Sequence, residues 1–243
     1  MARFTDKVFL ISGGARGLGE AQARQIVAEG GRVVIGDVLQ AEGEQLATQI
    51  GSACTFVMLD VTRETEWAAA VEIAERMGKL AGLVNNAGVY TPMPMAETDT
   101  ALFERHTRVN QLGTFLGMRA VLAPLKRNGG GAIVNMSSTV ALRSAPNSIA
   151  YTASKWAVRG MTKAAALELV DSGIRVNSVH PGPIDTPMLD VRSRAENLRR
   201  VQQIPMKRLG TKEEIASLVL YLLSDDSRYM TGSEVAMDGG AAL

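Results

Sequence analysis

The sequence predicts an α/β protein with one doubly wound domain, in which a seven-stranded parallel sheet carries helices on both faces. Short runs of β-branched and other apolar residues alternate with longer stretches of helical periodicity. The runs are apolar throughout, as in strands that are covered on both faces. No low-complexity linker or change of composition divides the 243 residues, so we expect a single domain over 1–243.

Each expected element follows from a local pattern. Glycines after the helical stretches mark their ends, as at Gly30 and Gly78. The expected strands are 7–12, 32–38, 54–61, 80–88 with its turn, 131–138, 174–182 and 234–240. The expected helices are 17–30, 41–50, 64–78, 102–108, 111–126, 151–171 and 212–224. The polar, arginine-rich segment 187–205 fits neither pattern, and we expect a mobile substrate lid there, over the carboxyl edge of the sheet.

Composition narrows the function classes. A net charge of +1 gives no electrostatic case for a nucleic-acid or membrane partner. A single cysteine, Cys54, excludes an intrachain disulfide and fits the cytoplasm. The amino terminus lacks the apolar run of a signal peptide, and no segment approaches the roughly 20 apolar residues of a membrane span. His106 and His180 have no cysteine or acid at ligand spacing, so we expect no metal site.

A glycine turn follows the first expected strand. Gly13, Gly17 and Gly19 allow a tight turn and a close approach of the backbone to a pyrophosphate at a helix N-terminus. Asp37 ends the second strand, where a carboxylate binds ribose hydroxyls and repels a 2′-phosphate, which favours NAD over NADP. Arg16, inside the turn, favours a 2′-phosphate instead, and Val38 adds no second positive charge.

Tyr151 and Lys155 lie four residues apart in an expected helix, and therefore on the same face. A tyrosine with the ordinary pKa of ~10 is a weak base near neutrality, and a nearby positive charge lowers that pKa. The spacing alone also occurs by chance on ordinary helices.

Five motifs in one order bring these signals together: SGGARGLG, LVNNAG, IVNMSS, YTASK and VHPGPIDTPM. With them the chain resembles the short-chain dehydrogenase/reductase family from Lys7 to Gly240. Within the family, its motifs are most similar to those of the bacterial NAD-dependent hydroxysteroid and secondary-alcohol dehydrogenases of the 3α,20β type. The resemblance implies a Rossmann domain, NAD(H)-dependent exchange between a secondary alcohol and a ketone, and a homotetramer.

The resemblance also implies roles for individual residues. Tyr151 is the acid/base, Lys155 supports it and binds the nicotinamide ribose, Ser138 holds the substrate oxygen, and Asn110 anchors a water. The implied cofactor-binding residues are Gly13, Arg16, Gly17, Leu18, Gly19, Asp37, Val38, Asp60, Val61, Asn86, Ala87, Gly88, Tyr151, Lys155, Pro181, Gly182, Ile184 and Thr186. The implied substrate-binding residues are Ser138, Val140, Asn147, Tyr151 and Met188.

The implied pocket is mostly apolar, which favours a steroid, alicyclic or aromatic carbonyl. Two alternatives stay open. Arg192, Arg194, Arg199 and Arg200 in the lid are typical of a solvated helix face, or would dock an acidic carrier in a 3-oxoacyl-[acyl-carrier-protein] reductase that uses NADPH. The more distant alternative is a dinucleotide-sensing protein without turnover.

Overall fold

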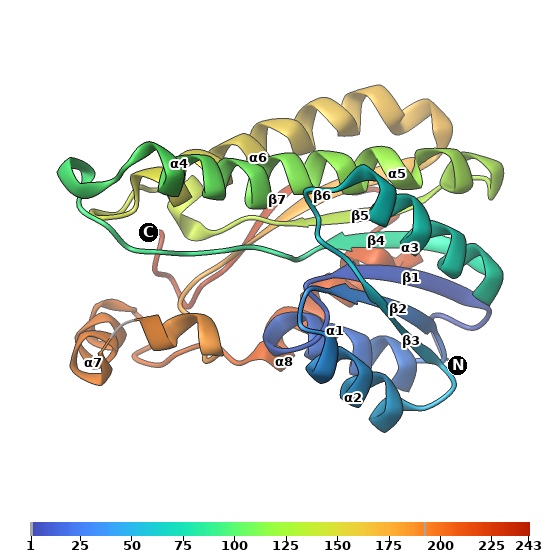
Figure 1. Ribbon diagram of the computed structural model, residues 1–243, viewed down its shortest axis with the longest axis horizontal. Helices are drawn as coiled ribbons and strands as arrows, with labels where there is room; N and C mark the ends of the chain where they lie inside the picture. The colour runs from blue at the N-terminus through green and yellow to red at the C-terminus, as the bar shows by residue number, and fades with distance from the viewer. Residues whose placement is uncertain (1, 192) are drawn as a thin grey trace.

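The computed structural model describes residues 2–191 and 193–243, and it confirms the predicted seven-stranded sheet. All neighbouring strands pair in parallel, in the order β3-β2-β1-β4-β5-β6-β7 (Figure 1). The strands are β1 (Lys7–Ser12), β2 (Arg32–Asp37), β3 (Cys54–Met58), β4 (Lys79–Asn85), β5 (Gly131–Met136), β6 (Ile174–Pro181) and β7 (Glu234–Met237).

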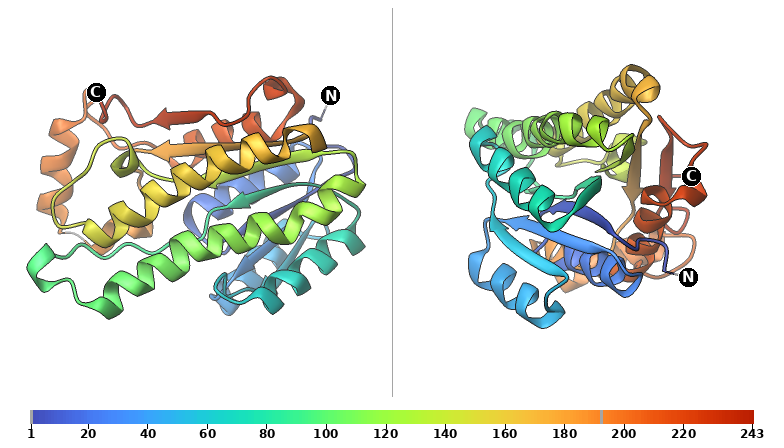
Figure 2. Two further views of the ribbon diagram at one scale, coloured as in Figure 1. Left: turned by 90° about the horizontal axis from the view of Figure 1, so that it is seen from above. Right: turned by 90° about the vertical axis from the view of Figure 1, so that its right-hand side faces the viewer.

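Helices cover both faces of the sheet, as predicted (Figure 2). One face packs against α1 (Gly17–Ala28), α2 (Gln40–Ile50) and α8 (Lys212–Leu223). The other packs against α3 (Glu64–Met77), α5 (Gly113–Arg127) and α6 (Ile149–Leu169). None of the helices in the described part of the chain is long and apolar enough to cross a membrane.

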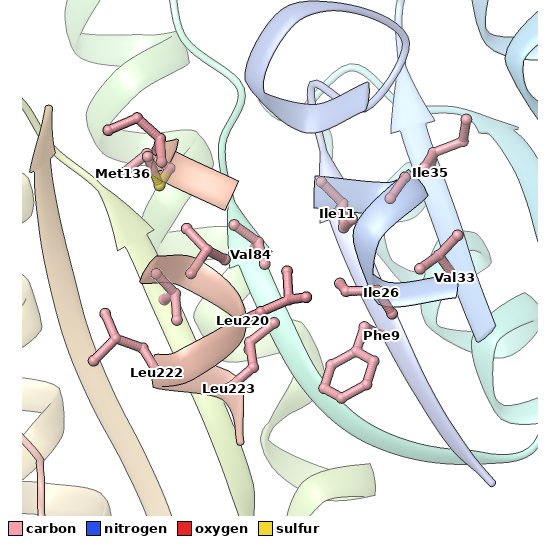
Figure 3. Close-up of a cluster of buried hydrophobic side chains, with 14 of the residues drawn as sticks. Phe9, Ile11, Ile26, Val33, Ile35, Val84, Met136, Leu220, Leu222 and Leu223 are labelled. Atoms are coloured by element: carbon pink, nitrogen blue, oxygen red, sulfur yellow. The ribbon is translucent and has the colours of Figure 1, made fainter. Parts of the chain in front are cut away.

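The first strand shows why the strand sequences are apolar without alternation. Val8, Phe9, Leu10 and Ile11 are all fully buried. Because successive side chains point to opposite faces, Phe9 and Ile11 enter the core beneath α1 and α8 (Figure 3), while Val8 and Leu10 enter the core beneath α3 and α5. Each face thus receives its own hydrophobic core.

The two helices expected at 102–108 and 111–126 are both present, but no break separates them. α4 (Thr100–His106) passes through a π-helical turn, Thr107–Leu112, directly into α5. A π turn inserts an extra residue without breaking the helix, and the sequence has no glycine or proline there to reveal it. Asn110 lies in this turn and is fully buried.

The expected lid contains a ten-residue helix, α7 (Arg194–Gln203), preceded by a 3₁₀ turn, Pro187–Val191. A capping box begins α7: the Ser193 hydroxyl accepts from the Glu196 N–H, and the Glu196 carboxylate accepts from the Ser193 N–H at 2.8 Å. In Figures 1 and 2, α7 and α4 extend beyond the same end of the sheet. Arg192 lies outside the described residues.

The strand order reverses between β1 and β4, because the chain first winds outward to β3 and then crosses back. In open α/β sheets, ligands bind at the carboxyl ends of the strands at such a reversal. β3 and β5 end earlier than expected, at Met58 and Met136, so Asp60, Val61 and Ser138 lie just beyond the strands, at this edge.

Candidate active site

A cavity of about 550 Å³ opens at the reversal point. Its lining contains the predicted residues Gly13, Arg16, Gly17, Leu18, Asp37, Val38, Asp60, Val61, Asn86, Ala87, Gly88, Thr186 and Met188. The structure therefore brings together residues from five segments that are far apart in sequence. The volume lies within the range of small-molecule and cofactor sites.

The glycine turn has the geometry that its spacing predicts. Gly13 and Gly17 adopt positive φ angles of 65° and 61°. A Cβ at Gly19 would come within 2.2 Å of the Gly13 carbonyl oxygen, so only glycine fits. A Cβ at Gly17 would meet nothing nearer than Thr186 at 3.9 Å, which leaves open space at the start of α1. These features fit a pyrophosphate against the free N–H groups of the helix terminus.

Asp37 lines the same cavity and is held by backbone N–H groups. Its carboxylate accepts hydrogen bonds from the Ala15 N–H at 3.0 Å and from the Leu39 N–H at 3.1 Å. The side chain is largely buried, and each oxygen keeps a further lone pair for a ribose hydroxyl. Arg16 and Val38 line the same cavity, so the opposing cofactor signal at Arg16 is also in place.

The segment after β4 is joined to the glycine turn by hydrogen bonds. The Ser12 hydroxyl accepts from the N–H groups of Asn86 and Ala87, both at 3.2 Å, and the Asn86 amide donates to the Gly13 carbonyl at 2.8 Å. Asn86 therefore holds two loops of the cofactor cavity together. Beside Asp60, the Thr62 N–H donates to its carboxylate at 2.9 Å, which fixes the turn after β3.

Tyr151, Lys155, Ser138 and Asn110 meet beside this cavity. The Ser138 side chain lies beside Tyr151 and lowers the pKa of its phenol. The Lys155 ammonium lies 5.7 Å from the Tyr151 ring centre and donates to the Met136 carbonyl at 2.8 Å. The predicted group is thus assembled from the end of β5, from α6 and from the π turn.

The Asn110 side chain makes three hydrogen bonds with two neighbours. Its amide oxygen accepts from the Val89 N–H at 2.8 Å, and its amide nitrogen donates to the Val89 carbonyl and to Ser154 Oγ, both at 3.0 Å. Ser154 Oγ in turn donates to the Tyr151 carbonyl at 2.7 Å. Asn110 therefore connects the loop after β4 to the helix that carries Tyr151.

Burial dominates the electrostatics of the pair. It raises the pKa of Tyr151 to about 12, although the hydrogen bond from Ser138 opposes that rise. It also lowers the pKa of Lys155 to about 8. The pKa of Tyr151 is therefore above its ordinary value and not below it as expected, because burial of the phenol is the largest effect on it.

The segment after β6 lies partly outside the cavity. Thr186 lines it, whereas Pro181 pairs with Met237 of β7, and a Cβ at Gly182 would come within 2.7 Å of the Asp238 Cα. Ile184 is buried and bridges to Gly210, which fixes the start of the segment that leads into the lid.

Substrate-side loops flank Tyr151. The Tyr90 ring packs on Tyr151 with centroids 4.8 Å apart. Asn147 adopts a positive φ of 56°, which asparagine tolerates, and its carbonyl accepts from the Met93 N–H at 2.8 Å. This contact joins the loop after β4 to the loop before α6. Val140 follows Ser138, and its N–H donates to Ser138 Oγ at 3.3 Å.

Sequence reasoning missed two contributions. Arg105 and Val109 line the cavity from the α4 side. His106, interpreted only as a non-ligand, accepts from the Thr91 N–H at 3.2 Å and its ring lies 6.2 Å from that of Tyr151. Its four-residue spacing from Asn110 was the available signal, because it puts both on one helix face.

The site can now be compared with known proteins. A family model described as Enoyl-(Acyl carrier protein) reductase matches residues 13–242. The 3-alpha-(or 20-beta)-hydroxysteroid dehydrogenase of Mycobacterium bovis is 45% identical over 239 residues, which cover 98% of this chain and 90% of that protein. The chain belongs to the short-chain dehydrogenase/reductase family.

Two further members extend the comparison. The trans-4-hydroxycyclohexanecarboxylate dehydrogenase of Sinomonas cyclohexanicum is 43% identical over 248 residues, covering 98% of this chain and 93% of that protein. The 3-ketoacyl-(acyl-carrier-protein) reductase from Brucella melitensis, whose crystal structure is complexed with NADH, has a TM-score of 0.93 and 34% identity over 98% of this chain and 99% of that chain. The protein is thus an oxidoreductase of the alcohol dehydrogenase type, with a dinucleotide-binding fold.

Proposed function

We propose that this enzyme interconverts an apolar cyclic secondary alcohol and its ketone, with NAD(H) as cofactor. The observation that carries the proposal is the group formed by buried Tyr151 and Lys155 with the half-buried Ser138, beside the cavity that contains the glycine turn and Asp37. The substrate class is supported by the relatives, which are named for a steroid and a cyclohexane carboxylate.

In the proposed reaction, the nicotinamide exchanges a hydride with the carbonyl carbon of the substrate. Tyr151 donates its phenolic proton to the substrate oxygen in reduction and takes it back in oxidation. Ser138 donates a hydrogen bond to the same oxygen and holds it near Tyr151. Lys155 supplies a positive charge in a dry environment, where it stabilises the phenolate more strongly than it would in water.

Asp37 is the basis for proposing NAD over NADP. Its carboxylate is desolvated and held by two backbone N–H groups, so it has little freedom to turn away from a 2′-phosphate. Bringing a phosphate against such a carboxylate is costly. Arg16 opposes this preference only from the exposed side of the turn, whereas Asp37 is fixed by the fold.

A second candidate is the reduction of a 3-oxoacyl thioester on a carrier protein. The structural similarity to the Brucella melitensis reductase favours it, and Arg199 is exposed on α7. Since that reductase was crystallised with NADH, cofactor preference alone does not distinguish the two candidates. The two candidates differ in the substrate that they reduce.

The test is steady-state reduction of a panel of cyclic ketones and of an acetoacetyl thioester, each with NADH and with NADPH. We expect NADH-dependent turnover of the cyclic ketones and little turnover of the thioester. Efficient reduction of the thioester, without turnover of any cyclic ketone, would replace the proposed substrate class with the second candidate.

We further propose a cytoplasmic homotetramer. Exposed apolar side chains on the helices of one face support a self-association surface, among them Phe103, Phe115, Trp156 and Leu167. Light scattering after size-exclusion chromatography tests it: a mass four times the 25.9 kDa chain is expected, and a monomer at micromolar concentration contradicts it.

A further inference from the structure

The segment Ser138–Ala141 determines the direction of the Ser138 hydroxyl. It leaves the end of β5 and turns as a 3₁₀ helix over Thr139–Ala141. Ser138 Oγ accepts from the Val140 N–H at 3.3 Å, which uses one of its lone pairs. The hydroxyl also lies beside Tyr151 and lowers its pKa. Because the Val140 N–H belongs to the same turn, the backbone of the segment restrains the direction of the Ser138 hydroxyl.

Three carbonyl groups of this segment accept hydrogen bonds from side chains outside it. His180 Nδ1 lies 3.1 Å from the Ser138 oxygen. Trp156 Nε1 donates to the Val140 oxygen at 3.0 Å. Arg159 donates to the Ala141 oxygen at 3.0 Å.

The state of His180 follows from its partners. A carbonyl oxygen only accepts, so Nδ1 carries the proton. Nε2 then accepts from Ser178 Oγ, 2.9 Å away. The ring is fully buried, and burial lowers the pKa of His180, with Glu234 opposing the effect and Arg159 and Lys155 adding to it. His180 is therefore a neutral donor with a fixed tautomer.

Arg159, like His180, is held in place by its neighbours. Its guanidinium pairs with Glu234 of β7 at 2.6 Å and lies 4.9 Å above the Trp156 ring. The two donors on α6 therefore support one another. The same helix carries Tyr151, so the segment and the tyrosine are attached to one rigid element.

We propose that His180, Trp156 and Arg159 form a clamp of positioning residues that keeps the Ser138 hydroxyl aligned with Tyr151. The proposal rests on the function proposed above for Ser138 and Tyr151. None of the three clamp residues needs to touch the substrate.

His180 also links the clamp to the cofactor side of the site. It directly precedes Pro181, the first residue of the segment that is expected to hold the nicotinamide. One side chain thus ties the segment that orients the substrate oxygen to the segment that positions the hydride donor. Misplacement by about 1 Å costs about a hundredfold in rate, so this tie is expected to affect turnover.

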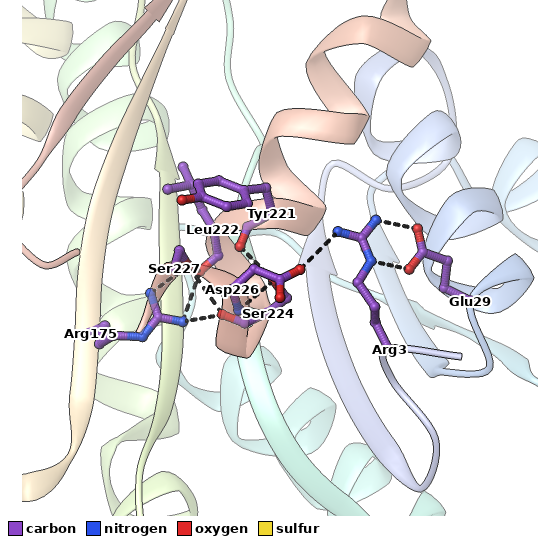
Figure 4. A network of polar contacts seen from close by, with 8 residues as sticks. All are labelled: Arg3, Glu29, Arg175, Tyr221, Leu222, Ser224, Asp226 and Ser227. Atoms are coloured by element: carbon purple, nitrogen blue, oxygen red, sulfur yellow. Dashed lines mark hydrogen bonds and ion pairs between the residues drawn. The ribbon is translucent and has the colours of Figure 1, made fainter. Parts of the chain in front are cut away.

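Arg175 offers a matched control. It also holds backbone carbonyls, those of Leu222 and Ser224 at 3.0 Å each (Figure 4). It lies five residues before His180 on β6, and therefore roughly 16 Å away along the strand. Arg175→Gln removes hydrogen bonds to backbone carbonyls at the opposite end of the same strand.

The experiment compares His180→Leu, which loses the donor, with His180→Asn, whose amide nitrogen can replace Nδ1. We expect kcat for ketone reduction to fall about tenfold to a hundredfold in His180→Leu and to be largely restored in His180→Asn. The Kd for NADH should change less than about threefold in both, an amount worth about 0.6 kcal/mol. Arg175→Gln should lower the melting temperature and leave kcat unchanged.

The pH profile separates positioning from a structural role. The hydrogen bond from Ser138 lowers the pKa of Tyr151. Loosening it in His180→Leu should therefore move the rising limb of kcat/KM for alcohol oxidation to higher pH. Trp156→Phe, which keeps a ring and loses the N–H, should move it in the same direction and provides the test if His180→Leu does not fold.

The outcomes are distinct. Wild-type kcat and an unmoved limb in both His180→Leu and Trp156→Phe overturn the clamp while leaving the proposed function intact. Absence of turnover in the wild-type enzyme on the whole ketone panel overturns the proposed function, and the clamp with it.

Discussion

The Lys155 ammonium is buried, with an exposed fraction of only 4%, and it donates a hydrogen bond to the Met136 carbonyl. Burying a charged lysine in this way destabilises the folded state, and such residues are kept where function requires them. The pKa of about 8, against an ordinary 10.5, makes that cost about 3 kcal/mol at most. Lys155, proposed to support the phenolate, is therefore expected to destabilise the folded protein.

Lys155→Met should accordingly stabilise the cofactor-free protein at pH 7. Because the folded pKa is lowered, the unfolded chain binds more protons between pH 8 and 10.5, and wild-type stability rises with pH across that window. The gain from the substitution should shrink over the same range. Urea unfolding at several pH values measures it, with exposed Lys126→Met as the control. A gain that does not change with pH contradicts the argument.

Asp37→Ala should relax the proposed preference for NAD over NADP. Removing the carboxylate removes the repulsion toward a 2′-phosphate and leaves Arg16 in the cavity to bind it. We expect the ratio of kcat/KM values for NADH and NADPH to fall by at least about tenfold, which corresponds to about 1.4 kcal/mol. An unchanged ratio would show that Asp37 does not discriminate between a ribose 2′-hydroxyl and a 2′-phosphate.

At the scale of elements, the strands and most helices could be predicted, because burial on both faces produces continuous apolar runs and glycines end the helices. The π turn could not, since inserting one residue into a helix changes no composition or periodicity that a short window detects. It matters because it carries Asn110, whose amide holds both Val89 and Ser154.

The α7 helix was missed for a different reason. Its face is polar and arginine-rich, so hydrophobic periodicity gives no signal for it. The Ser193-x-x-Glu196 capping box was the available signal and was passed over.

Ser193→Ala should fray the start of α7 at a cost of about 1 kcal/mol. If 187–205 is a substrate lid, KM for a ketone rises while the Kd for NADH stays near the wild-type value. Thr211→Ala is the matched control, since Thr211 and Glu214 form the same capping box on α8, which packs against the sheet. That variant should lower the melting temperature instead. Unchanged KM in Ser193→Ala contradicts a lid role.

At the scale of the whole molecule, the site depends on strand order, which brings residues from opposite ends of the chain to one edge. Sequence motifs identified Tyr151, Ser138 and Asp37, because each follows a recognisable pattern. They did not reveal the contact of His106 with the Thr91 N–H or that of His180 with the Ser138 carbonyl, because a hydrogen bond between residues far apart in the chain leaves no mark in local sequence. Family motifs thus predict the groups expected to react better than the groups that hold them.

Cofactor binding should stabilise the entire fold, because the cavity joins loops from both halves of the sheet. A ligand at a hundred times its Kd adds about 2.7 kcal/mol. For a chain of this size that corresponds to a rise in melting temperature of about 5–10 °C. Thermal scans with equal concentrations of NADH and NADPH should show a larger rise with NADH. A larger rise with NADPH contradicts the assignment of the ribose site.

The most direct test of the central claim is ketone reduction with NADH by the wild-type enzyme and by Tyr151→Phe, with NADH binding measured in both. We expect turnover by the wild type, a loss of at least about a thousandfold in kcat for the variant, and NADH binding within about threefold of the wild type. A Tyr151→Phe enzyme that turns over at the wild-type rate would contradict the acid/base role on which the account depends.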